Sequence, residues 1–202
     1  DTQMKRLVCI WCALGIAVAT VAAQQPGWVD PAKFVQPATD SWPTYNGDYS
    51  GRRFSTLTKI STGNVHSLSL GWTFRVPAGL GDGVPIKGTP IMINGVMYVT
   101  VPDHVWALDA RTGRELWHYA WESKGGIHIG NRGVAIAGDS LYFETPDCHL
   151  VSLAVKDGSE RWRKAICNLD EFYYGSVAPV VVKPETASKT ESVNESSGTS
   201  LR

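Results

Sequence analysis

The chain lacks an excess of either charge. Its 202 residues include 19 Lys or Arg and 19 Asp or Glu, so the formal net charge is zero. Proteins that bind nucleic acid or anionic membrane surfaces need a basic field, and this composition does not supply one. The sequence therefore argues against both of these partners.

Cysteine is also scarce. Two of the four cysteines, Cys9 and Cys12, stand close to the N-terminus. No Cys-x-x-Cys pair occurs elsewhere and the five histidines are scattered, so zinc or haem ligation has little support. Only Cys148 and Cys167 remain as candidates for a structural role.

No apolar run reaches the roughly 20 residues needed to span a bilayer. An apolar run over residues 7–19 follows Met4, Lys5 and Arg6, and small residues up to Ala23 close it. This order predicts a secretory signal peptide in residues 1–23, with a short upstream extension and cleavage near Ala23. We therefore expect a periplasmic or secreted protein without a membrane span after cleavage.

The C-terminal end has almost no apolar residues. Residues 183–202 contain eight Ser or Thr, a composition that predicts disorder. They directly follow residues 177–182, which read as a buried strand. Because such a strand normally continues into more core, we expect that the chain is cut short.

Three tryptophans recur at one interval in the middle of the chain. Trp72, Trp117 and Trp162 are spaced 45 residues apart, and the residues preceding the last two also match. A period near 45 residues is typical of β-propeller blades. We expect a structural role for these tryptophans, with each ring filling the gap between adjacent blades; chance spacing is the alternative.

Alternation and turn residues predict four strands within one period, over residues 89–94, 96–101, 105–109 and 115–120. The predicted fold class is all-β, with four-stranded antiparallel blades. Residues 24–182 hold roughly two and a half blades, whereas between about four and eight close a propeller. We therefore predict an incomplete propeller.

Residues just before the innermost strand of each blade converge at one mouth of a propeller channel. The equivalent positions in the three repeats are Lys87, Arg132 and Ser176. Arg offers a planar fork for carboxylates and Lys a point charge, so the set suits an anionic, hydrogen-bonding ligand. Ordinary solvated loop residues are the alternative.

Five further motifs follow one another along the chain: residues 48–55, Asn64-Val65 leading to residues 71–74, Gly88-Thr89-Pro90, residues 107–110 with Thr112-Gly113, and Asn131-Arg132-Gly133. In this order they resemble the start of quinoprotein alcohol and glucose dehydrogenases, over about residues 42–183. The resemblance implies an eight-bladed propeller that holds pyrroloquinoline quinone (PQQ), and usually calcium, on its axis. It implies hydride transfer from an alcohol or sugar to the quinone, an electron acceptor as partner, and quinone contacts by Arg132 and Ser176.

The chain departs from the family pattern at several points. Lys87 stands where the family usually has a glutamate, and Gly126-Ile127 replaces the vicinal cysteines of methanol-type members, which argues against a methanol dehydrogenase. The family's calcium-binding glutamate and catalytic aspartate have no counterpart in this chain. We therefore predict no catalytic or metal-binding residue here and expect an inactive N-terminal fragment of the enzyme.

Two other readings remain open. One is a non-catalytic propeller that binds protein partners in the periplasm or in outer-membrane assembly, because tryptophan repeats occur there too. The other is a degenerate gene product without activity. The Asn131-Arg132-Gly133 motif favours the dehydrogenase.

The two remaining cysteines are placed symmetrically about a turn signal. Asp157-Gly158 predicts a two-residue hairpin turn, and Cys148 and Cys167 are equally distant from it. Residues facing each other in this way have Cα atoms about 4.5 to 5.5 Å apart, which a disulfide can bridge. We expect this disulfide; a bulge at Gly158 would shift the register, and two buried thiols are the alternative.

Overall fold

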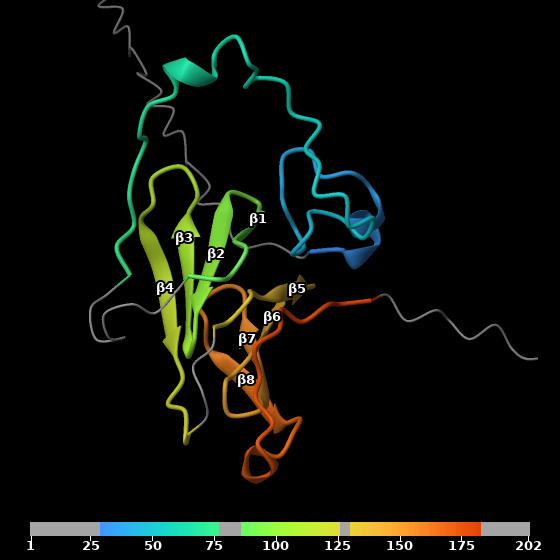
Figure 1. The fold of residues 1–202 in the computed structure, drawn as a ribbon, viewed down its shortest axis with the longest axis vertical. Coiled ribbons are helices and arrows are strands. Elements are labelled where there is room, and N and C mark those ends of the chain that lie inside the picture. Colours follow the sequence, from blue (N-terminus) through green and yellow to red (C-terminus); the bar gives the residue numbers. More distant parts are fainter. Residues whose placement is uncertain (1–28, 77–85, 126–129, 183–202) are drawn as a thin grey trace, which may run out of the picture.

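The structure is a computed structural model that describes residues 29–76, 86–125 and 130–182. In these ranges the chain forms two four-stranded antiparallel sheets, whose strands pair in sequence order (Figure 1). The all-β blade architecture is thus confirmed. The predicted signal peptide and the predicted 183–202 tail lie outside the described residues. No helix in the described ranges is long and apolar enough to cross a membrane.

The strands of the two sheets have well-defined limits. The first sheet contains β1 (Ile91–Ile93), β2 (Val96–Val101), β3 (His104–Asp109) and β4 (Glu115–Ala120). The second contains β5 (Ala135–Ala137), β6 (Ser140–Glu144), β7 (His149–Ala154) and β8 (Glu160–Ala165). Three short 3-10 helices lie outside the sheets: η1 (Pro31–Val35), η2 (Val65–Ser67) and η3 (Leu169–Glu171).

Both faces of the first sheet are covered. On one face, Tyr98 and Trp117 belong to a core that continues into the second sheet through Phe143 and Val151. On the other face, Trp106 packs with side chains that include those of residues 74 and 76. Side chains alternate between the two faces of a strand, so this double burial explains the nearly continuous apolar sequence of β2 and β3.

The N-terminal segment closes the inner edge of both sheets. Trp42 exchanges two backbone hydrogen bonds with Met92 of β1, at 2.7 and 2.9 Å. Val29 exchanges two with Gly138, directly after β5, at 2.7 and 2.9 Å. The segment therefore ties the two inner strands to one another, although it forms no strand of its own in the described part of the chain.

Two of the repeated tryptophans dock on the following blade. Nε1 of Trp72 donates to the carbonyl of Ala110 at 3.2 Å, and Nε1 of Trp117 donates to the carbonyl of Val155 at 3.0 Å. Each ring also lies flat against a glycine of the same loop, Gly113 or Gly158. The outer tryptophan of one blade therefore sits on the β3–β4 or β7–β8 loop of the next.

Trp162 has a different environment from the other two. Its side chain is 44% exposed, and its ring lies 5.9 Å from that of Tyr142 in the same sheet. This ring contact of Trp162 is thus made inside its own blade.

The predicted two-residue turn at Asp157-Gly158 is wrong. Ala154 and Ser159 close a loop of four residues instead, because the N–H of Gly158 bonds back to the carbonyl of Ala154 at 2.8 Å. The pairing of β7 with β8 then shifts at a bulge between Ser152 and Leu153. As a result Cys148 faces Ile166, whose N–H donates to its carbonyl at 2.9 Å, and not Cys167.

The buried strand predicted over residues 177–182 is also wrong. These residues form no strand, and Val177, Val180 and Val182 are exposed. A strand exists only through pairing with a neighbour. In the described ranges the backbone of this segment bonds to side chains instead. The N–H of Val177 donates to the carboxylate of Glu144, and the carbonyl of Val181 accepts from the hydroxyl of Tyr49.

Candidate cofactor-binding site

The structure brings two of the three predicted site residues into direct contact. Nη1 of Arg132, on the connection before β5, donates to the carbonyl oxygen of Ser176 at 3.0 Å and to its Oγ at 2.9 Å. The N–H of Thr89, just before β1, donates to the carbonyl of Arg132 at 3.1 Å. The segments that precede the two inner strands are therefore adjacent, and the one before β5 also adjoins the segment that carries Ser176.

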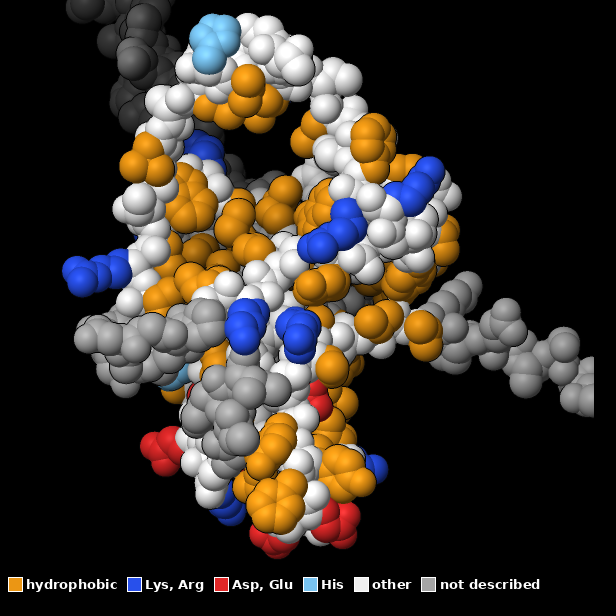
Figure 2. Space-filling view, viewed as in Figure 1, with side chains coloured by type: hydrophobic (Ala, Val, Ile, Leu, Met, Phe, Trp, Pro, Cys, Tyr) orange, Lys and Arg blue, Asp and Glu red, His pale blue; other side chains and the backbone are white. Residues whose placement is uncertain are grey.

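Lys87 lies beside the same segments. A Cβ built on Gly130 would approach Lys87 Cδ to 2.7 Å, so the aliphatic part of Lys87 crosses the backbone two residues before Arg132. Both basic side chains are exposed. Figure 2 shows Lys and Arg side chains at the middle of the face in view and also along its edges, whereas its Asp and Glu side chains lie toward the lower end.

The neighbours of Arg132 in the sequence fix its backbone. Asn131 is buried; its Nδ2 donates to the carbonyl of Glu144 at 2.9 Å, and its Oδ1 accepts from the N–H of Gly133 at 2.8 Å. Gly133 has a φ of 133°, where a side chain would be strained. The Asn-Arg-Gly motif thus consists of an anchor, an exposed cation and a glycine that permits the turn.

A buried glutamate, which the sequence did not single out, positions Ser176. Oε2 of Glu144 accepts from the N–H of Val177 at 2.9 Å. Burial raises the pKa of Glu144, while the backbone N–H groups of Val177 and Ser176 act against that rise. The sequence offered no signal for this role, because Glu144 ends β6 and is far from Ser176 along the chain.

Arg53 is a second residue that the sequence did not single out. Its Nη2 donates to Oγ1 of Thr89 at 3.2 Å, and its guanidinium lies 5.0 Å from the ring centre of Tyr45. It therefore reaches the start of β1 from the N-terminal segment. Its position inside the 48–55 motif was the only available signal.

The donor set suits a ligand with carboxylates. In the described part of the chain neither Arg53 nor Arg132 forms an ion pair; their acceptors are hydroxyl and carbonyl oxygens. Two guanidinium groups, an ammonium and hydroxyl groups fit an acidic quinone such as PQQ. For a metal ion, the described residues contain no group of three or more His, Cys, Asp or Glu side chains, so no ligand is assigned.

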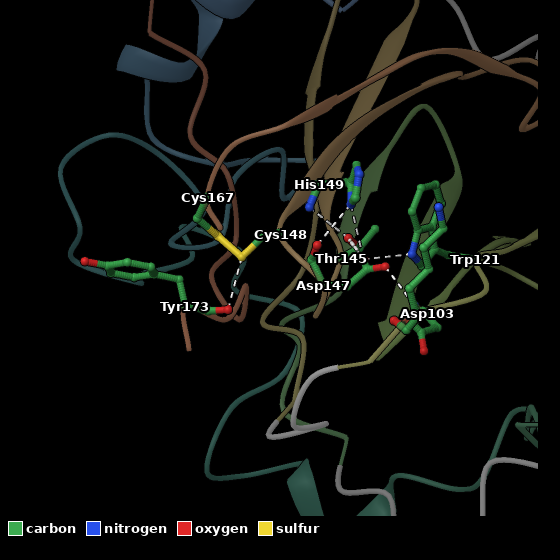
Figure 3. Close-up of polar contacts among 10 residues, drawn as sticks. Asp103, Trp121, Thr145, Asp147, Cys148, His149, Cys167 and Tyr173 are labelled. Carbon is green, nitrogen blue, oxygen red and sulfur yellow. Dashed lines mark hydrogen bonds and ion pairs between the residues drawn. A yellow bond between two sulfur atoms is a disulfide. The ribbon is translucent and has the colours of Figure 1, made fainter. Parts of the chain in front are cut away.

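A disulfide and a buried carboxylate brace the turn between β6 and β7 (Figure 3). Cys148 and Cys167 are joined, with their Cα atoms 5.1 Å apart. The bond forms despite the shifted register, because Cys167 is only one residue beyond the paired position. It ties the turn before β7 to the segment that leads to Ser176.

The buried carboxylate is that of Asp147. Its Oδ1 accepts from Nε1 of Trp121 at 2.9 Å and from Oγ1 of Thr145 at 2.5 Å, and its Oδ2 accepts from the N–H of Lys124 at 3.0 Å. Trp121 and Lys124 follow β4, whereas Asp147 belongs to the turn between β6 and β7. Asp147 therefore connects the first blade to the second, and Figure 3 shows Trp121 pointing toward it.

The sequence and the fold are similar to those of known proteins. Residues 42–158 match the family model of the glucose, ethanol and alcohol dehydrogenase β-propeller domain of PQQ enzymes. The 1-butanol dehydrogenase (cytochrome c) of Thauera butanivorans is 34% identical over 154 residues, which cover 72% of this chain and 22% of that protein. The 1-butanol dehydrogenase (quinone) of the same organism is 30% identical over 198 residues, 96% of this chain and 31% of the relative.

Solved structures give the same result. A quinohemoprotein alcohol dehydrogenase from Pseudomonas putida superposes with a TM-score of 0.70 and 31% identity, covering 80% of this chain and 24% of that one. A europium-containing methanol dehydrogenase superposes with a TM-score of 0.65 and 26% identity, covering 75% of this chain and 27% of that one. The chain thus spans between about a fifth and a third of the length of these relatives. It belongs to the β-propeller family of PQQ-dependent alcohol dehydrogenases.

Proposed function

We propose that the chain forms the first blades of an exported PQQ-dependent dehydrogenase that oxidises an alcohol or a sugar. The named relatives support an alcohol, since they are 1-butanol and other alcohol dehydrogenases. The N-terminal sequence supports export to the periplasm. As in the relatives named for cytochrome c and for quinone, the electrons would pass to a separate acceptor.

In this proposal the chain's own residues bind and orient the cofactor. Arg132 would donate to a carboxylate of the quinone through those of its guanidinium N–H groups that are not bonded to Ser176. Ser176 adds a hydroxyl, and its place is set by Glu144 and by the disulfide-linked segment before it. Lys87 contributes a positive charge where related enzymes carry a glutamate. The quinone, when bound, supplies the two-electron acceptor for the substrate's hydride.

The observation that carries the proposal is the contact of Ser176 with Arg132, and Arg132 lies inside the segment that matches the PQQ family. It is tested by titrating the full-length dehydrogenase that contains these blades with PQQ and following the quenching of tryptophan fluorescence. A charged hydrogen bond is worth about 1.5 to 3 kcal/mol, so Arg132→Ala is expected to weaken binding by roughly that amount.

Arg111→Ala is the matched control for this titration. Arg111 is an exposed cation on the β3–β4 loop, at the other end of the sheet, so its loss changes the net charge equally without touching the site. Equal affinities for the wild type and Arg132→Ala would contradict the proposed role of Arg132. An absence of PQQ binding in every variant would instead favour a non-catalytic propeller that binds protein partners.

A further inference from the structure

We propose that Arg53 is a further cofactor-binding residue, which contacts the acidic quinone from the N-terminal segment. This inference rests on the proposed function. Both arginines adjoin Thr89: Arg53 donates to its Oγ1 at 3.2 Å, and the carbonyl of Arg132 accepts from its N–H at 3.1 Å. Residues that are 79 positions apart in the sequence are thus joined through one residue at the start of β1.

The charges at this point call for an anion. Among the residues that the structure describes, Arg53 has no carboxylate partner; its contacts are a hydroxyl and the face of Tyr45. Its neighbour Arg52 turns back on its own segment, where Nε donates to Oγ of Ser50 at 3.0 Å. Arg53 and Arg132 therefore present two guanidinium groups without carboxylate partners in the described ranges, on segments that both adjoin Thr89, and a ligand with several carboxylates could pair with both.

The backbone at Arg53 gives independent support. Its φ is 54°, in the left-handed region, which costs a residue with a side chain roughly 1 to 2 kcal/mol. Glycine adopts this region without that cost, as Gly51 does two residues earlier with a φ of 71°. Strain of this kind concentrates at functional sites, where the side chain itself is needed.

A purely structural role for Arg53 makes a different prediction. If Arg53 only fastened the N-terminal segment to β1 through Thr89, its removal would lower the melting temperature, and affinity would fall only as a consequence. Replacement by glycine distinguishes the two roles, because Arg53→Gly removes the side chain and the backbone strain together.

The test is a PQQ titration of the full-length dehydrogenase that contains these blades and of its Arg53→Ala, Arg53→Gly, Arg52→Ala and Arg132→Ala variants, with the melting temperature of each. We expect both Arg53 variants to bind PQQ about tenfold more weakly, as for a charged hydrogen bond, and Arg52→Ala to bind like the wild type. We also expect Arg53→Gly to melt no lower than the wild type.

The outcomes separate this inference from the proposed function. If Arg132→Ala loses affinity while both Arg53 variants stay within twofold of the wild type, the role of Arg53 is wrong and the proposed function stands. If Arg53→Gly loses affinity only together with several degrees of melting temperature, Arg53 is structural and the inference also fails. If the wild type binds no PQQ, the proposed function fails and takes the inference with it.

Discussion

At the scale of single residues, Asp147 is the most constrained polar group of the described chain. Its side chain is buried, and its carboxylate accepts hydrogen bonds from Trp121, Lys124 and Thr145. Burial works to raise the pKa of Asp147, but the donors Thr145, Lys124 and Trp121, together with the charge of His149, outweigh it and hold that pKa below its ordinary value. The carboxylate is therefore favoured by the folded state.

Asp147→Asn is expected to cost about 1 to 3 kcal/mol of unfolding free energy at pH 7, because an amide presents a donor to groups that are donors themselves. A lowered folded pKa gives stability above the ordinary value of 3.8, and this stability is lost as the pH falls through the folded pKa. The difference between wild type and variant should therefore shrink below about pH 4. Urea unfolding from pH 7 to 3 measures it, with the exposed Asp170→Asn as control, and a pH-independent difference would contradict this account.

Sequence reasoning found the site residues that a repeat can mark and missed those that only the fold brings together. Lys87, Arg132 and Ser176 occupy equivalent positions of successive repeats, so spacing alone aligned them. Glu144 and Arg53 do not belong to a set of site residues that share one position in successive repeats. Their contacts cross from β6 and from the N-terminal segment, and no local pattern records a contact of that range.

At the scale of elements, the loops between the outer strands of each blade have one design. Gly113 and Gly158 both have a φ of 72°, and both close a bond to the carbonyl four residues earlier, at 2.8 Å. The ring of Trp72 covers Gly113, and the ring of Trp117, from the preceding blade, covers Gly158. The glycine is therefore required twice, by the backbone conformation and by the approach of the ring.

Gly158→Ala is expected to destabilise the chain by about 2 to 4 kcal/mol, since it combines left-handed strain with overpacking. A Cβ at this position would lie 2.5 Å from Cε3 of Trp117. Gly51→Ala is the matched control: its φ of 71° is nearly the same, but nothing lies within 4 Å of the added Cβ. It should cost only about 1 kcal/mol, and equal losses for the two variants in thermal unfolding would show that the ring contact is unimportant.

These loops also explain why the sequence predicted the disulfide partners but not their register. Asp-Gly favours a two-residue hairpin, yet the Asp157 carboxylate bonds to the N–H and hydroxyl of Ser159, at 3.0 and 2.7 Å, and supports a wider loop. The bulge at Ser152 then moves the pairing back toward the predicted register, which brings Cys148 and Cys167 within reach. The wider loop moves the register by two residues and the bulge restores one of them, so Cys167 stands one residue beyond the position opposite Cys148.

At the scale of the whole molecule, the period of 45 residues was sufficient to predict the blades. Predicted strands 96–101 and 115–120 coincide with β2 and β4, because alternation and turn glycines are local properties. The segment 177–182 shows the limit of this approach. Its apolar sequence is that of a strand, but pairing is a property of neighbours, which composition does not specify.

The two blades should unfold as one unit, and Trp121 is the residue that couples them. Trp121 is 8% exposed, and its backbone N–H donates to the carbonyl of Asp103 in the first blade at 2.7 Å. Its ring contacts the second blade: Nε1 donates to Asp147, and the guanidinium of Arg163 lies 4.8 Å from the ring centre. Removing a buried tryptophan costs about 3 to 5 kcal/mol, and here the loss falls on the contact between sheets.

In the wild type, hydrogen exchange protection is therefore expected to be lost together in β2–β3 and in β6–β7 as urea increases. In Trp121→Ala the two sets of amides should separate, because each blade then opens with less support from the other. Trp162→Ala is the control, since it removes the same side chain from a position 44% exposed and within one sheet. If the amides of both blades still exchange together in Trp121→Ala, the coupling lies in the shared apolar core around Trp117 and Phe143 and not in the Trp121–Asp147 contact.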